Sequence, residues 1–75
     1  MQWDVTRTDA GPDIETGKLM YLVSARTDQF AEWLSITVTI EDTGDEASNQ
    51  MRALDRAAET ASTFAQAVRA QLSEA

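Results

Sequence analysis

Acidic side chains gather in one short run of this sequence. Four carboxylates, Glu41, Asp42, Asp45 and Glu46, stand within six residues, and the 75-residue chain carries a net charge of −7. Carboxylates can transfer protons, bind divalent cations or meet the basic groups of a partner. The chain has no histidine and no cysteine, which are the usual general base and the most reactive nucleophile near neutral pH. These residue types favour recognition over catalysis, so we expect no enzymatic activity and no cofactor.

Two chemical interpretations of the acidic run fit it poorly. Asp42-Thr43-Gly44 matches the triplet of aspartic proteases, but those enzymes hold two carboxylates on apolar loops of a larger β-rich fold. Here Glu41 and Asp45 flank the triplet. A calcium loop needs oxygen ligands at EF-hand spacing, which this run lacks. We therefore expect neither a protease nor a metal site.

A second set of candidate binding residues precedes the acidic run. Asp28 and Glu32 lie on either side of Phe30 in a connecting segment, and Trp33 opens the next predicted strand. Aromatic residues beside charges are typical anchors of protein interfaces, and they can equally cover the edge of a sheet. The sequence predicts a partner-binding surface with charge contacts first in the acidic run and second at Asp28 and Glu32. Phe30 and Trp33 are the predicted apolar anchors.

Three predicted strands must position these residues. The clearest covers 33–41, where β-branched and other apolar residues alternate with polar ones and Trp33 points to the opposite face. An apolar segment at 18–26 predicts the central strand, and 2–8 predicts a weaker one. Residues 9–13 contain Gly and Pro and predict a turn. Together these segments predict an antiparallel meander.

A helical period follows the acidic run. Apolar residues at steps of three and four predict one long helix over 45–72, and Thr43 and Glu46 have the spacing of a capping box at its start. The predicted apolar stripe consists of Ala47, Met51, Leu54, Ala58, Ala61, Ala65, Val68 and Leu72. The whole chain, 1–75, is therefore expected to form a single α+β domain, in which the three-stranded antiparallel meander packs against this C-terminal helix.

The predicted helix is longer than the predicted strands. At 1.5 Å per residue it would span about 42 Å, against about 28 Å for a strand of eight or nine residues, so one end should overhang the sheet. An overhanging apolar stripe favours a partner, which could be a second copy of the chain. We therefore expect a homodimer as one alternative.

In size, acidity and element order the chain resembles small phage and mobile-element proteins of the anti-CRISPR type. This resemblance implies a stoichiometric inhibitor whose acidic groups occupy the basic surface of a nucleic-acid-processing complex. The acidity disfavours direct binding to nucleic acid or membranes. The first residues lack the features of a signal peptide, so we expect a cytoplasmic protein. The alternative is a homodimeric structural or accessory protein of a phage or bacterium, whose acidity serves solubility only.

Overall fold

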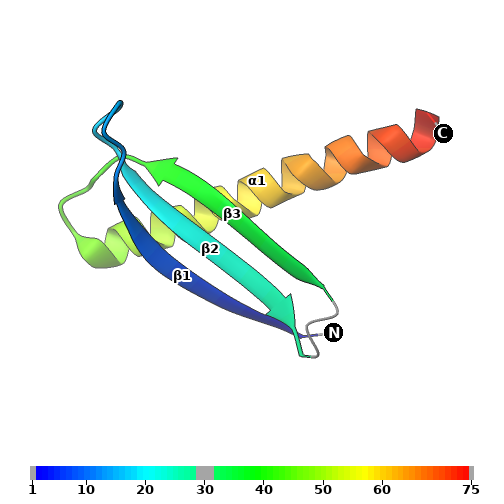
Figure 1. Ribbon diagram of the computed structural model, residues 1–75, viewed down its shortest axis with the longest axis horizontal. Coiled ribbons are helices and arrows are strands. Elements are labelled where there is room, and N and C mark those ends of the chain that lie inside the picture. Colours follow the sequence, from blue (N-terminus) through cyan, green and yellow to red (C-terminus); the bar gives the residue numbers. More distant parts are fainter. Residues whose placement is uncertain (1, 29–31, 75) are drawn as a thin grey trace.

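The computed structural model describes residues 2–28 and 32–74 of the chain. The elements are β1 (Trp3–Pro12), β2 (Leu19–Thr27), β3 (Trp33–Ile40) and α1 (Glu46–Glu74). The strands form an antiparallel sheet in the order β1-β2-β3, and α1 crosses one face of it (Figure 1). The predicted β-β-β-α arrangement is confirmed, with the apolar second strand at the centre.

Strand β1 is longer than predicted because a β-bulge next to Gly11 lets its pairing with β2 continue to Pro12. The register with β2 shifts between Asp9 and Gly11, so Ala10 has no paired residue on β2. Gly11 has a φ of +88°, and its amide donates a hydrogen bond to Asp9 Oδ1 at 2.8 Å. Glycine adopts this left-handed conformation without strain, so pairing resumes and Pro12 is tolerated on the edge strand. The predicted turn over 9–13 is therefore wrong, because the chain leaves the sheet only at Asp13.

The core is small and lies where the first half of α1 crosses β2 and β3. Ala53 and Ala57 are one helical turn apart and carry no side chain beyond Cβ, so the helix backbone can approach the sheet closely. Six hydrophobic residues of the described part of the chain are buried: Tyr21, Val23, Val38, Ile40, Ala53 and Ala57.

The buried face of α1 differs from the predicted stripe in the first half of the helix. Met51 and Ala58 are exposed, whereas Ala53 and Ala57 are buried. The prediction followed the alternating steps of four and three that connect Ala47, Met51, Leu54 and Ala58. Close packing on the sheet instead selects the two alanines, and it rotates the larger side chain towards solvent.

Helix α1 extends beyond the sheet, as its length predicted. Its 29 residues correspond to about 43 Å at 1.5 Å per residue, close to the longest dimension of the molecule, 44 Å. Figure 1 shows the helix crossing the strands obliquely and leaving the sheet past the edge of β3. Much of the second half of α1 therefore has no strand beneath it.

Candidate functional site

The acidic run forms a hydrogen-bonded junction between β3 and α1, organised by Asn49. This side chain is 5% exposed, and its Oδ1 accepts hydrogen bonds from the amide and the hydroxyl of Thr43 at 2.9 and 2.8 Å. Its Nδ2 donates to Asp42 Oδ1 at 3.0 Å, and the Gly44 amide donates to the same oxygen at 2.8 Å. The buried amide group is thereby satisfied, and the chain direction between strand and helix is fixed.

Asp45, and not Thr43, caps the helix. Its Oδ2 accepts hydrogen bonds from the amide and the hydroxyl of Ser48 at 3.1 and 2.7 Å, as an N-cap carboxylate does. The predicted capping box between Thr43 and Glu46 is therefore wrong. The Thr43 hydroxyl is engaged within the junction, and Glu46 Oε1 accepts a hydrogen bond from Gln50 Nε2 at 3.4 Å.

The donors around the two aspartates lower their pKa values. For Asp42 the largest cause is the hydrogen bond from the Gly44 amide, followed by that from Asn49. The pKa of Asp45 is lowered most by the Ser48 hydroxyl and then by its amide. Hydrogen bonds to the charged form of a carboxyl stabilise that form. Both groups are therefore ionised at neutral pH, where they accept hydrogen bonds and attract cations and do not share a proton.

The sheet register brings further acids to the same end of the molecule. Ile40, the last residue of β3, pairs with Leu19, which pairs in turn with Pro12. The β1–β2 turn, with Asp13 and Glu15, therefore lies at the edge of the sheet where the acidic run begins. We define the acidic end as the carboxylates of Asp9, Asp13, Glu15, Glu41, Asp42, Asp45 and Glu46.

Three of these acids act together on Tyr21. Burial raises the pKa of this tyrosine most, followed by the charges of Asp9, Glu46 and Asp42. These acids come from β1, from the first turn of α1 and from the junction, so three separate segments contribute to one electrostatic field. Sequence reasoning did not assign the acids of β1 and its turn to this site. The predicted meander could have indicated this grouping, because it places the turn after the first strand and the start of the helix at the same end of the sheet.

Basic residues border the acidic end on one flank. Lys18 Nζ lies 3.4 Å from Glu41 Oε1, in an exposed ion pair of the kind that contributes little to stability. Arg52 and Arg56 line a groove together with Lys18 where α1 passes the edge of β3, and the acids Glu41, Asp55 and Glu59 line the same groove. The negative charge is therefore offset on this flank only in part.

The remaining predicted site residues lie at the opposite end of the sheet. Asp28 follows β2, Glu32 precedes β3, and Trp33 begins β3, so all three lie where β2 ends and β3 begins. Phe30 lies outside the described residues. The structure therefore divides the predicted set into two groups, with the acids of 41–46 at one end and these three residues at the other.

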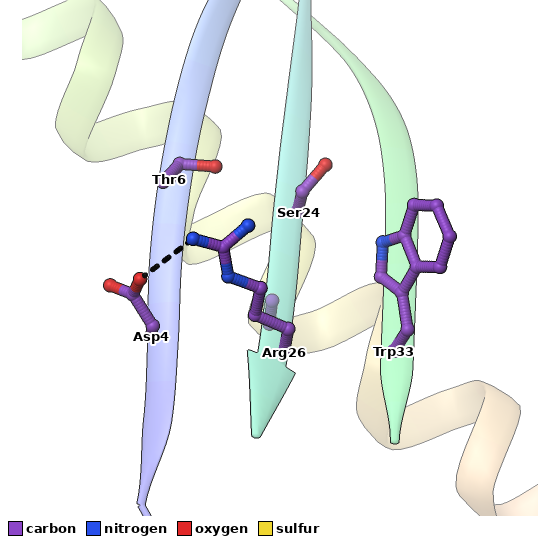
Figure 2. Close-up of a pocket in the computed structure, with 6 residues that line it drawn as sticks. Asp4, Thr6, Ser24, Arg26 and Trp33 are labelled. Atoms are coloured by element: carbon purple, nitrogen blue, oxygen red, sulfur yellow. Dashed lines mark ion pairs between the residues drawn. The ribbon is translucent and has the colours of Figure 1, made fainter. Parts of the chain in front are cut away.

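Trp33 belongs to a row of side chains on the sheet face that α1 leaves open (Figure 2). Asp4, Arg26 and Trp33 are paired residues of β1, β2 and β3, and Asp4 Oδ2 lies 3.6 Å from Arg26 Nη2. Trp33 is 75% exposed, and the hydroxyls of Thr6 and Ser24 lie beside this row in the same hollow. An exposed tryptophan and an arginine on an open face have the composition of a protein interface.

Comparisons with protein-family models, with curated proteins and with solved structures found no match for this chain. Within residues 2–28 and 32–74, no helix is long and apolar enough to cross a membrane. The same residues contain no group of three or more His, Cys, Asp or Glu side chains that could hold a metal ion. The structure thus defines an α+β domain of β-β-β-α order whose main charged feature is the acidic end.

Proposed function

We propose that this chain is a non-enzymatic binding protein whose acidic end occupies a basic surface of a protein partner. The observation that carries the proposal is the gathering of seven carboxylates from β1, the β1–β2 turn, the junction and the first turn of α1. A partner that holds nucleic acid offers such a surface, because it presents arginine and lysine to phosphates. The protein would then compete with nucleic acid in the cytoplasm, as an inhibitor of the anti-CRISPR type that it resembles in size and charge.

The acids of this end have two roles in the proposal. Asp42 and Asp45 accept hydrogen bonds from backbone amides, so they set the shape of the surface as well as its charge. Glu41 and Glu46 are exposed, and their partners are side chains. These two glutamates can therefore be changed without disturbing the turn. Trp33 and its neighbours would reach the same partner only if that partner spans the length of the sheet.

A matched pair of double variants tests the proposal. Glu41→Lys/Glu46→Lys and Glu59→Lys/Glu74→Lys change the net charge equally, and each removes one exposed ion pair. Tagged protein captures the partner from a lysate of the source organism, and its affinity is then measured against salt and competing DNA. Close opposite charges dominate such contacts at low salt, so we expect the first variant to weaken binding at least ~10-fold and the second less than ~2-fold. Equal losses in both variants, or binding that neither salt nor DNA weakens, would contradict the proposal.

A further inference from the structure

The second half of α1 exposes large apolar side chains on one stripe. Phe64, Val68 and Leu72 are 59%, 42% and 70% exposed. Ala61 and Ala65 lie on the same stripe at helical spacing and are half-buried. The stripe continues the face that the first half of α1 packs on the sheet, past the edge of β3. The apolar side chains on this face of the helix therefore remain largely exposed in a single chain and are available for contact with another molecule.

The sheet face beneath α1 is also uncovered at one end. Trp3, Val5 and Leu34 lie on the face that buries Ile40, yet they are 43%, 49% and 36% exposed. Val5 and Leu34 belong to one row, since both pair with Ala25 of the central strand. The uncovered end therefore presents an apolar surface that spans all three strands.

These two surfaces meet at a notch between helix and sheet. Leu34, Ile36, Thr60 and Phe64 line a groove at the point where α1 leaves β3. Beyond this groove the helix and the sheet diverge, so neither apolar surface covers the other within one chain (Figure 1). We define the tail notch as the exposed apolar side chains of Trp3, Val5, Leu34, Phe64, Val68 and Leu72.

We propose that the tail notch binds a second copy of this chain, with the helix tail of each copy seated on the uncovered sheet end of the other. The six side chains together expose on the order of 600 Å² over the two surfaces, which is at the upper end of the largest apolar patch on a typical monomeric protein. A standard interface removes about 800 Å² from each partner, of which about two thirds is apolar in homodimers. The tail notch thus supplies the apolar area that a stable dimer needs.

The distribution of charge favours this face for contact between two copies. The chain carries −7, so two copies repel each other wherever their acidic surfaces meet. The acidic end lies at the other end of the sheet. Residues 60–73 contain a single charged side chain, Arg69, whose charge is opposite to that of Asp28 and Glu32 beside the uncovered end. A reciprocal exchange of helix tails also closes on itself, as a two-fold dimer requires. The dimer leaves the acidic end free, so it does not depend on the function proposed above.

The association state of the purified chain tests the proposal. By sedimentation between about 1 and 100 µM we expect a dimer, and Val68→Glu/Leu72→Glu should raise its dissociation constant at least ~10-fold, because it buries charges in the apolar contact. Met51→Glu/Ala58→Glu is the matched control, since it adds the same two charges at exposed positions in the first half of the helix, outside the tail notch. Circular dichroism verifies that each variant is folded. A wild-type monomer at about 100 µM, or equal dissociation by the control, would overturn the proposal.

Disulfide trapping tests how the two copies are seated, because the chain contains no cysteine. When Val5→Cys and Val68→Cys variants are mixed in equal amounts and oxidised, we expect the mixed disulfide to exceed the sum of the two homodimeric products, which random pairing would only equal. Thr37→Cys is the control, since Thr37 lies on the open face of the sheet. If Thr37→Cys links to Val68→Cys as efficiently as Val5→Cys does, the reciprocal seating is wrong.

Discussion

The two ends of the sheet face beneath α1 are built from the same strands, yet only one of them is covered. Near Ile40 the first half of α1 closes over the face, and Ala53 is 0% exposed. Near Leu34 the same face lies open, because the helix crosses the strands obliquely and leaves the sheet (Figure 1). Both ends carry alternating apolar residues. The direction of the helix, and not the composition of the strands, therefore decides which end becomes core.

The junction at the covered end sets this direction. Asn49 ties the first turns of α1 to the segment after β3, and Asp45 caps the helix. Once the start of a long helix is fixed, the position of its tail follows from its straightness and length. The acidic residues of the junction thus determine two surfaces, the acidic end that they form themselves and the tail notch that lies at the far end of the helix.

The largest expected effect contrasts two positions on one strand. Ile40 and Leu34 lie on the same face of β3, but the first is buried beneath α1 and the second is partly exposed. We expect Ile40→Ala to lower the free energy of unfolding by about 2–5 kcal/mol, because it leaves a cavity in a small core. Leu34→Ala should lower the free energy of unfolding by about 1 kcal/mol, because the partly exposed Leu34 side chain buries less apolar area than Ile40 does. Urea denaturation of both variants in the Val68→Glu/Leu72→Glu background, in which the proposed dimer is weakened, measures these costs, and equal costs would show that α1 covers the far end within one chain.

The elements of this fold could be predicted from the sequence because their periods are local. The strand predicted over 33–41 is observed at Trp33–Ile40, and the helix predicted over 45–72 is observed at Glu46–Glu74. The bulge at Gly11 escaped prediction, because a glycine next to a proline equally signals a turn. The rotation of α1 about its own axis, which decides the face that packs on the sheet, was not predicted either. Alanine occurs on several faces of α1, and only the approach of the sheet selects Ala53 and Ala57.

The candidate site was predictable in part. A meander places the turn after its second strand and the end of its third strand at opposite ends of the sheet, so the separation of Asp28 and Glu32 from the acidic run follows from the predicted topology. The role of Asn49 in organising the junction does not follow from the predicted topology. A polar residue one turn into a helix ordinarily faces solvent, and its burial depends on the conformation that the junction adopts around it.

A smaller loss is expected when the junction itself is weakened. Asn49→Ala removes the acceptor of the Thr43 amide and hydroxyl and one donor to Asp42. We expect a loss of about 1–3 kcal/mol, even though alanine is the better helix former, because the partly buried Thr43 amide loses its acceptor. The Thr43 hydroxyl and Asp42 keep their hydrogen bonds to the Asp45 carbonyl and from the Gly44 amide. The control is Gln50→Ala, which removes two exposed hydrogen bonds, one accepted from Arg7 Nε and one donated to Glu46 Oε1, and should stay within about 0.5 kcal/mol. If thermal denaturation gives both variants the same stability, Asn49 does not hold the junction.

The smallest expected effect is the part of the acid-induced loss of stability that comes from the cap of α1 at the covered end. The pKa of Asp45 lies below its ordinary value of 3.8 because Ser48 donates two hydrogen bonds to the carboxylate. Near pH 4 the unfolded chain therefore binds more protons than the folded one, and stability falls as the pH drops through the folded pKa. Asp45→Asn keeps a good N-cap but cannot titrate, so it should match the wild type at pH 7 and lose less stability between about pH 4 and 2. Urea denaturation across this range measures the difference. An unchanged acid dependence in Asp45→Asn would mean that the cap does not couple folding to protonation.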